Sequence, residues 1–478
     1  MERIAAVVLA AGKGTRMKSD RAKVLHETCG RPIAYFPIRA ALAQGSSPVV
    51  VVVGHQADAV QKTLSSLFTA APIEFALQAE QLGTGHAVLS AEAALRKAGF
   101  GDRGSVLIVA GDVPLITAET LQRLVQAKAE SKAPLALLTT HVAEPRGYGR
   151  IVRNPKGGIE RIVEEKDATP EERRIKEVNA SIYICDAGFL FAALSRTGRS
   201  NAQGEYYLTD IVAAAAALAK EGRAAWPASV EASEDEVSGV NDRAQLAASA
   251  ATLRERRLAQ LMKEGVTVVD PRTTFLDEGV EVGVDSVLEP MVSLRGKTKL
   301  GKNVEVGQGS ILVDVEVEDG ARILPYCHMT ESKIGKGAVL GPFARLRPLA
   351  DVRENAHVGN FVELKKTVLG KGSKANHLSY LGDAVIGEGC NIGAGTITCN
   401  YDGANKYVTT IEDGAFVGSD TQLIAPITVK KGAYVGTGTT VREDVPPGSL
   451  AVSAGKQRNI EGWVEKKAPK KATGKKTG

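Results

Sequence analysis

The sequence is poor in cysteine and in aromatic residues, and it contains no long apolar run. Its five cysteines are scattered and share no Cys-x-x-Cys spacing, which argues against a disulfide framework and a zinc site and predicts reduced thiols in a cytoplasmic protein. No segment approaches the ~18 apolar residues of a membrane span. The apolar run at residues 4–11 is followed by a Gly-Lys-Gly turn instead of a signal-peptide cleavage site. We therefore expect neither a membrane span nor export.

Acidic and basic residues nearly balance over most of the chain. Residues 464–478 hold six lysines and one glutamate, which accounts for the net charge of +5, and residues 463–478 are predicted to form a basic disordered tail. Because nothing else in the chain continues this basic stretch, we expect no nucleic-acid partner. The 478 residues exceed the size at which a single core stops growing, about 250 to 300 residues, so two domains are expected.

Residues 1–240 alternate short apolar runs with helix-like stretches. This alternation predicts an α/β Rossmann-like domain, with a mostly parallel sheet covered by helices on both faces and ligands at the carboxyl ends of its strands. Strands are predicted at residues 3–9, 49–53, 73–77, 106–110 and 135–139, and helices at 33–44, 84–97 and 117–131, the last with Thr117 as its cap. A linker helix is predicted at residues 241–263.

In residues 264–462 the pattern changes to one apolar residue at every sixth position. One series runs Val282, Leu288, Leu294, Leu300, Val306 and Leu312, and the pattern resumes at 334–364 and 417–441. A period of six fits neither an α-helix nor an alternating strand, but it suits a parallel β solenoid in which each hexad supplies one short strand and a corner. The interruptions at 313–333 and 365–416 are predicted to be loops that leave the coil.

A glycine-rich turn, LAAGKGTRM at residues 9–17, follows the first predicted strand and is itself followed by Lys23. Backbone N–H groups in such a turn can approach phosphates, although a short turn of this kind also occurs as a plain strand-to-helix connection. It matches neither the Walker A pattern nor GxGxxG. The whole string resembles the sugar-nucleotidyltransferase signature. QAEQLGTGH at residues 78–86 brings it closer to the uridylyltransferases that use N-acetylglucosamine 1-phosphate.

This resemblance implies Mg²⁺-dependent transfer of a uridylyl group from UTP to N-acetylglucosamine 1-phosphate. It implies that Arg16 stabilises the transition state, that Lys23 holds phosphate and that Asp112 and Asn241 hold Mg²⁺. The implied substrate-binding residues are Leu9, Ala10, Ala11, Gly12, Gln78, Gly83, Thr84, Gly149, Glu164, Asn179 and Asn241. The chain departs from the usual family pattern by having Ala110 in place of Tyr and Ala180-Ser181 in place of Thr-Gly, all at the sugar pocket.

Residues 341–405 contain the strings GPFARLRP, VGNFVELKK, GSKANHLSYLGD and GAGTITCNYDG. They resemble the bifunctional N-acetylglucosamine-1-phosphate uridyltransferase/glucosamine-1-phosphate N-acetyltransferase family, to which both halves and the connector correspond. The resemblance implies that the solenoid is a left-handed parallel β-helix built of hexapeptide repeats. It also implies a homotrimer that shares its acetyl-transfer sites between chains.

The same resemblance implies that acetyl-CoA first acetylates glucosamine 1-phosphate. A base must remove a proton from the sugar ammonium, and His377, with an ordinary pKa near ~6.5, suits that task, with Glu363 to orient or polarise it. The implied sugar-phosphate site comprises Arg347, Lys365, Tyr380, Asn391, Asn400 and Tyr401, and the acetyl-CoA site Ala394, Ser419 and Thr437. Ala454 stands where the family often has an arginine for a CoA phosphate, and Lys456 or Arg458 are alternative replacements.

Two other interpretations stay open at this point. The chain could be a single-activity nucleotidyltransferase whose solenoid only regulates or assembles it, which His377 together with Arg347 and Lys365 argues against. It could also be a binding scaffold without activity, an interpretation supported only by the departures at Ala110 and at residues 180–181.

Overall fold

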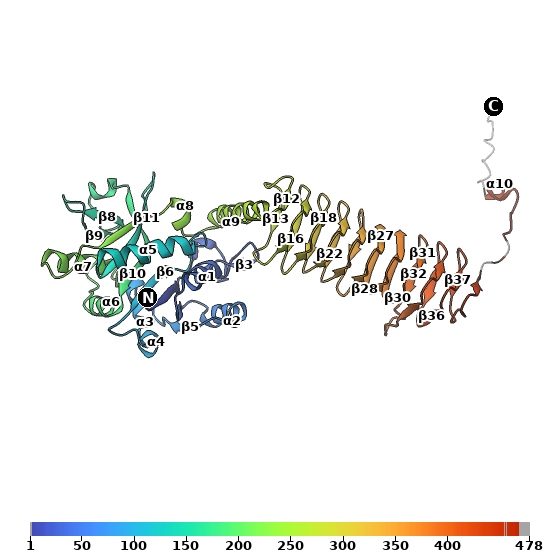
Figure 1. The fold of residues 1–478 in the computed structure, drawn as a ribbon, viewed down its shortest axis with the longest axis horizontal. Coiled ribbons are helices and arrows are strands. Elements are labelled where there is room, and N and C mark those ends of the chain that lie inside the picture. Colours follow the sequence, from blue (N-terminus) through green and yellow to red (C-terminus); the bar gives the residue numbers. More distant parts are fainter. Residues whose placement is uncertain (1, 454, 456, 468–478) are drawn as a thin grey trace, which may run out of the picture. The chain divides into compact units, whose positions relative to one another are not determined.

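The computed structural model describes residues 2–453, 455 and 457–467 and divides into two compact units (Figure 1). The first unit comprises Met1–Gln260 with Leu276–Glu278, and the second comprises Leu261–Phe275 with Gly279–Gly478. Ala454 and Lys456, named above for the CoA phosphate, and residues 468–478 of the predicted tail lie outside the described residues. Across the described ranges, no helix combines the length and the apolar character that a membrane crossing requires.

The first unit is built on a mixed sheet that has nine strands within the described residues. Its main path is β11 (Ala228–Glu231), β7 (Leu135–His141), β10 (Glu177–Asp186), β6 (Ser105–Ala110), β1 (Ile4–Ala10), β4 (Val49–Val53) and β5 (Ile73–Leu77). Off this path, β8 (Arg150–Arg153) pairs with β10, and β9 (Ile159–Val163) pairs with β8. Strands β6, β1, β4 and β5 are parallel, whereas β10 runs antiparallel to β6 and β7. The predicted α/β class is confirmed.

Helices pack on both faces of this sheet because alternate residues of its buried strands point to opposite sides. In β1, Ala5 and Val7 belong to one apolar core, and Ala6 and Val8 belong to the other. The helices are α1 (Tyr35–Gln44), α2 (Ala57–Leu67), α3 (Thr84–Ser90), α4 (Glu92–Lys97), α5 (Ala118–Ser131), α6 (Ala187–Leu194), α7 (Asp210–Lys220) and α8 (Glu234–Val237). A longer helix, α9 (Arg243–Lys263), follows them in the sequence. The single helix predicted over residues 84–97 is divided at Ala91.

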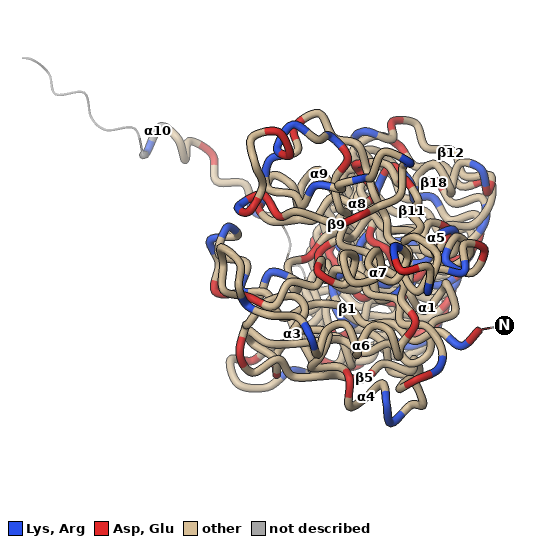
Figure 2. The backbone as a smooth tube through the Cα atoms, turned by 90° about the vertical axis from the view of Figure 1, so that its left-hand side faces the viewer, with Lys and Arg blue, Asp and Glu red and all other residues tan. Residues whose placement is uncertain are grey.

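Charged residues of opposite sign are interspersed over the first unit (Figure 2). Arg153 and Glu177 form one close pair, 2.6 Å apart, in which the two side chains are largely shielded from solvent. Hydrogen bonding to Glu177 raises the pKa of Arg153, and the same arginine lowers the pKa of Glu177 against the opposing effect of burial. Opposite charges therefore neutralise one another locally on this unit.

The second unit is a left-handed parallel β-helix, as the resemblance implies. Within the described residues its short strands stack into an 11-stranded sheet, from β12 (Thr267–Val268) to β39 (Leu450–Ala451), and a 17-stranded sheet, from β13 (Phe275–Leu276) to β38 (Thr440–Val441). The hexad residues point inward: Leu294 pairs with Leu312 on the next coil, and both are fully buried. The strands in the part of the coil that contains His377 include β25 (Arg345–Leu346), β27 (His357–Asn360), β28 (Glu363–Leu369), β29 (Lys374–His377), β30 (Tyr380–Ile386), β31 (Asn391–Ile392) and β32 (Ile397–Cys399).

The prediction of a loop at residues 313–333 is wrong. Strands continue through this segment, but Ile311 pairs with His328, seventeen residues later, whereas Leu294 pairs with Leu312, eighteen residues later. One corner is a residue shorter, and this shifts the hexad phase without breaking the coil. The prediction of a loop at residues 365–416 is also wrong for most of that segment, because β28 to β32 continue the coil as far as Cys399. The chain leaves the coil only between Cys399 and Thr409, and Ala384 therefore pairs with Thr409, twenty-five positions later. Within the predicted tail, Trp463–Lys467 form a helical turn, α10.

Candidate active sites

The first unit contains a cavity of about 670 Å³ at the carboxyl ends of β1 and β6. This volume falls within the range of roughly 300 to 1,000 Å³ typical of small-molecule sites. Twelve of the residues predicted for the first site line it, namely Leu9, Ala11, Gly12, Arg16, Lys23, Gln78, Gly83, Thr84, Asp112, Glu164, Asn179 and Asn241. Of the remaining two, Ala10 is buried at the end of β1, and Gly149 lies against Ile162 and Glu164, where a Cβ atom would crowd Ile162. Ala110, Ala180 and Ser181 also line the cavity.

In this cavity, side-chain oxygen atoms of Asp112 and Asn241 both contact the ammonium group of Lys23. Lys23 forms an ion pair with Asp112, and its Nζ atom lies 3.2 Å from Asn241 Oδ1. Arg16 donates to the same Oδ1 atom at 2.9 Å. Asn241 reaches this place because Val240 N donates to the carbonyl oxygen of Asp112 at 2.8 Å. The structure therefore brings together four residues that are up to 225 positions apart in the sequence.

This donor set fits a magnesium ion. A carboxylate and an amide oxygen are hard ligands of the kind Mg²⁺ takes, and Mg²⁺ usually completes its octahedron with water and substrate phosphates. Where side chains are described, no group of three or more His, Cys, Asp and Glu residues could hold a metal by itself. Asp112 and Asn241 would thus need phosphate and water as further ligands, and Lys23 would have to leave the space between them.

Glycines shape the loops that border the cavity. Gly14 has a left-handed φ of 62°, and a Cβ atom there would collide with the side chain of Lys23. Gly83 has a φ of 109°, and a Cβ atom there would lie 2.6 Å from the carbonyl oxygen of Tyr206. Gln81, which was not predicted as a site residue, donates from Nε2 to the carbonyl oxygen of Ala11 at 2.7 Å. It ties the QAEQLGTGH loop to the glycine-rich turn, and its place inside that motif was the available signal.

Glu164 and Asn179, the residues predicted to contact the sugar, line another part of the cavity. Thr209 donates to Glu164 Oε1 at 3.2 Å, and Asn179 Nδ2 donates to Tyr183 Oη at 2.6 Å. Burial raises the pKa of Glu164 above its ordinary value, and the nearby Asp167 and Asp210 add to this effect, against the hydrogen bond from Thr209. The ionised carboxylate of Glu164 is therefore held at a cost to folding, as is common where a buried group serves a ligand.

Glu164→Gln should raise the stability of the protein near pH ~7. The pKa of Glu164 is raised in the folded state, so its contribution to stability falls as the pH rises through the ordinary carboxyl range towards that raised pKa. Glutamine has no charge to desolvate, so the free energy of unfolding of the variant should be higher by on the order of 1 kcal/mol at neutral pH. Below about pH 4, where the glutamate is protonated in the folded and unfolded states, the two proteins should not differ. Calorimetric unfolding midpoints at both pH values measure this. An equal gain at both values would contradict it.

Ser181→Gly should also stabilise the protein. Ser181 has a φ of 57°, a left-handed conformation that costs an ordinary residue roughly 1 to 2 kcal/mol, whereas glycine adopts it freely. Glycine also loses more chain entropy on folding, which offsets part of this benefit. We therefore expect the free energy of unfolding to rise by about 0.5 kcal/mol. The matched control is Ser181→Ala, which removes the hydroxyl and keeps the strain. Equal unfolding midpoints for the two variants would contradict the strain argument.

The second site is centred on His377, at the end of β29. Its Nδ1 atom lies 2.9 Å from Oδ1 of Asn360, the residue opposite it on β27. An amide oxygen only accepts hydrogen bonds, so Nδ1 carries the proton and Nε2 presents a lone pair. His377 is exposed, which leaves Nε2 open to a substrate. Asn360 was not predicted, although it stands in the VGNFVELKK string.

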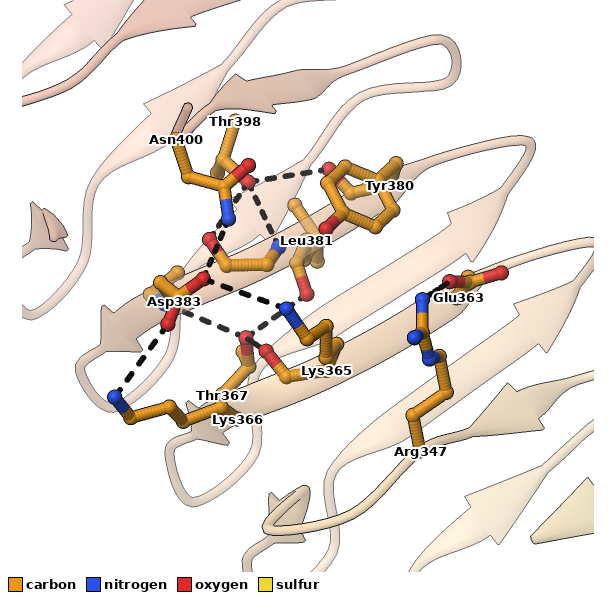
Figure 3. Close-up of polar contacts among 12 residues, drawn as sticks. Arg347, Glu363, Lys365, Lys366, Thr367, Tyr380, Leu381, Asp383, Thr398 and Asn400 are labelled. Atoms are coloured by element: carbon orange, nitrogen blue, oxygen red, sulfur yellow. Dashed lines mark hydrogen bonds and ion pairs between the residues drawn. The ribbon is translucent and has the colours of Figure 1, made fainter. Parts of the chain in front are cut away.

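Glu363 binds arginine in this structure. It accepts a hydrogen bond from Arg347 at 3.0 Å (Figure 3). Its other carboxylate oxygen lies 3.9 Å from Arg345 Nε. The contact that orients His377 Nδ1 comes from Asn360, whereas the sequence motif had suggested Glu363 for this task. Neighbouring strands bring further predicted residues to the same face, because Glu363 pairs with Tyr380 and Lys365 pairs with Gly382 along β28 and β30.

The predicted acetyl-CoA residues form a column along one corner of the coil. Asp420 N donates to the carbonyl oxygen of Ala394 at 2.7 Å, and Gly438 N donates to that of Ser419 at 2.8 Å. A Cβ atom on Gly418 would lie 2.6 Å from the backbone nitrogen of Thr437. Ala394, Ser419 and Thr437 thus occupy equivalent positions on three successive coils.

The other predicted sugar residues lie on neighbouring strands and on the loop that leaves the coil. Asn391 pairs with Lys374, one strand from His377. Asn400 is buried, whereas Tyr401 is 58% exposed and donates to the carbonyl oxygen of Gly403 at 2.5 Å. The loop between β32 and β33 (Thr409–Ile411) therefore places one of these residues in the coil wall and the other in solvent.

The chain is similar to known proteins over nearly its whole length. Residues 6–172 match the family described as the MobA-like NTP transferase domain. The "Bifunctional protein GlmU" of Anaeromyxobacter sp. (strain Fw109-5) is 55% identical over 464 residues, which cover 97% of this chain and 93% of the relative. The proteins of the same name from Anaeromyxobacter dehalogenans (strain 2CP-C) and Pelobacter propionicus are 53% and 48% identical, over 99% and 97% of this chain and 96% and 98% of the relatives.

Proposed function

This chain belongs to the GlmU family of bifunctional proteins, and from that membership we propose which of its residues carry out the two reactions of UDP-N-acetylglucosamine biosynthesis. It is both a glucosamine-1-phosphate N-acetyltransferase and an N-acetylglucosamine-1-phosphate uridyltransferase. Acetyl transfer comes first in our proposal, because a sugar pocket shaped for an N-acetyl group would lose contacts with a charged amine. The observation that carries the proposal is the 55% identity that extends over both units.

Uridylyl transfer takes place in the cavity of the first unit. A phosphate oxygen of N-acetylglucosamine 1-phosphate attacks the α-phosphorus of UTP in line, and the bond to pyrophosphate breaks. Arg16 and Lys23 neutralise the charge that develops on the phosphate oxygens. Asp112 and Asn241 would hold Mg²⁺, which would supply further neutralisation of this charge. Gln78, Gly83 and Thr84 contact the uracil, and Gly149, Glu164 and Asn179 contact the sugar.

Acetyl transfer takes place beside His377. Nε2 removes a proton from the ammonium of glucosamine 1-phosphate, and the amine attacks the thioester carbonyl of acetyl-CoA. The C–S bond breaks, and the departing CoA thiolate takes up the second proton that the amine nitrogen loses as the amide forms. Asn360 holds the imidazole in the tautomer that leaves Nε2 free, and Arg347 and Lys365 bind the sugar phosphate. Tyr380, Asn391, Asn400 and Tyr401 contact the sugar, while Ala394, Ser419 and Thr437 line the acetyl-CoA site.

The second unit assembles as a homotrimer in this proposal. Its support is a column of exposed apolar side chains on one corner, where the ring of Phe343 stacks on Tyr326 and Phe361 at centroid distances of 5.5 and 5.3 Å. These three rings are 46 to 56% exposed, and Leu378, beside His377, is 61% exposed. Exposed apolar patches of this kind mark interaction surfaces. Light scattering should give three times the mass of the chain, and a fully active monomer would contradict the assembly.

Two assays of the purified full-length protein test the function. The first follows release of CoA from acetyl-CoA with glucosamine 1-phosphate, and the second follows release of pyrophosphate from UTP, Mg²⁺ and N-acetylglucosamine 1-phosphate. Both products should form. Pyrophosphate alone would favour a single-activity nucleotidyltransferase, and neither product would favour a binding scaffold.

A further inference from the structure

Asp383 is a buried carboxylate in the wall of the second site that the reaction above does not use. It lies in β30, is only 5% exposed and has a left-handed φ of 48°. Aspartate and asparagine tolerate this conformation better than most residues. The cost of burying a charge means that such a carboxylate persists only when it is paired and hydrogen-bonded.

Three side chains lie around Asp383, namely Lys365 and Lys366 of the neighbouring strand β28 and Asn400, which directly follows β32 (Figure 3). Its Oδ2 atom accepts a hydrogen bond from Asn400 Nδ2 at 2.5 Å and lies 4.0 Å from Lys365 Nζ. Its Oδ1 atom lies 3.6 Å from Lys366 Nζ. Lys365 and Asn400 were assigned above to the sugar phosphate and the sugar, so Asp383 contacts one residue from each part of that site.

A third ammonium group, Lys406, lies close to this cluster. The pKa of Lys406 is lowered, first by its contact with Lys365 and by the charge of that lysine, whereas Asp383 acts in the opposite direction. Three lysines and one aspartate leave a surplus of positive charge, which suits a phosphate dianion. Without the carboxylate, the ammonium groups would repel one another and spread apart.

We propose that Asp383 is a positioning residue that holds Lys365 and Lys366 together as a seat for the phosphate of the acetyl acceptor. This inference rests on the proposed acetylation of glucosamine 1-phosphate. It extends the phosphate site to Lys366 and gives the buried carboxylate a role in substrate affinity. Since Asp383 acts through the lysines, its loss should impair binding of the phosphate more than the chemistry at the amine.

The test compares two acceptors, glucosamine 1-phosphate and glucosamine, in the full-length enzyme. Asp383→Asn keeps a residue type that tolerates the left-handed φ and an oxygen that can accept from Asn400, but it removes the charge. It should raise the KM for glucosamine 1-phosphate about 10-fold, with kcat within about twofold. The kcat/KM for glucosamine, which has no phosphate, should stay within about twofold. Asp383→Ala removes the acceptor for Asn400 as well, so it should impair both substrates.

Controls separate the seat from a merely structural role. Asp285→Asn is the matched control, because Asp285 is an exposed aspartate with a left-handed φ of 62° on an earlier coil, and it should change neither KM. Lys366→Met removes the ammonium group on the exposed side of the seat. It should raise the KM for glucosamine 1-phosphate several-fold and leave the kcat/KM for glucosamine unchanged.

Three outcomes would decide against the seat or its premise. Equal losses on both acceptors in Asp383→Asn, or unchanged KM values in Asp383→Asn and Lys366→Met, would overturn the inference. If Asp383→Asn fails to fold, the Lys366→Met result decides alone. A wild-type enzyme that does not acetylate glucosamine 1-phosphate would instead overturn the proposed function.

Discussion

His377→Ala should lower the rate of acetyl transfer by about 10²- to 10⁴-fold, the usual effect of losing a general base, and leave uridylyl transfer unchanged. The imidazole is exposed, and its Nδ1 atom is held by Asn360, so Nε2 is the atom available to take the proton. Without it, the ammonium of glucosamine 1-phosphate must lose its proton to solvent. Release of CoA at saturating acetyl-CoA measures the first activity, and release of pyrophosphate measures the second.

The matched control is His357→Ala, because His357 lies on β27, in the same sheet as His377. It should keep both activities. Asn360→Ala should lower the rate of acetyl transfer by about 10-fold, since it removes the contact that fixes the tautomer of His377 but leaves the base in place. If His377→Ala loses both activities equally, the protein has misfolded or the base is assigned wrongly. If it keeps acetyl transfer, another group removes the proton.

Asp112→Ala should lower uridylyl transfer by at least about 10²-fold, the scale of losing one preorganised charge contact to a transition state, and leave acetyl transfer intact. Asp112 supplies the carboxylate in the proposed metal site, and it also pairs with Lys23. Its loss would remove a ligand and leave the lysine without its carboxylate partner. Pyrophosphate release at increasing Mg²⁺ concentration measures this effect.

Asp112→Asn sharpens the test, because it keeps an oxygen ligand and loses only the charge. It should recover part of its activity at high Mg²⁺, whereas Asp112→Ala should recover little. Asp58→Ala, at an exposed aspartate in the first turn of α2, is the control and should behave like the wild type. An Asp112→Asn variant that responds to Mg²⁺ in the same way as the wild type would show that Asp112 is not a metal ligand.

The elements that were predicted well are those whose local sequence has only one suitable structure. The run of five valines at residues 49–53 became β4 with the predicted bounds, because β-branched residues between turn signals favour a buried strand. Thr117 caps α5 as expected, and its side chain accepts from the backbone nitrogen of Thr120. The antiparallel strand β10 was missed, since its direction depends on pairing with β6 and β7.

The candidate sites show the same division. Asp112 and His377 could be predicted, because the family resemblance implies their roles. Asn360 and Gln81 are marked only by standing in the VGNFVELKK and QAEQLGTGH strings. Asn360 matters because it lies opposite His377 on the next coil, and Gln81 because its amide reaches Ala11. Pairings of this kind depend on the register of distant strands and on the path of loops, which local sequence does not specify.

By itself the sequence determined the two-part architecture, the inward-facing hexad residues of the coil and the motifs of both activities, because periodicity and local spacing follow directly from the order of residues. Only the tertiary structure decided which groups meet. It placed Lys23 between Asp112 and Asn241, bound Glu363 to Arg347, and put Asp383 among its lysines. It also showed that a corner shortened by one residue causes the shift in the hexad phase after Leu312. The strands of successive coils keep their hydrogen-bonded pairing when a corner loses a residue, so the coil continues.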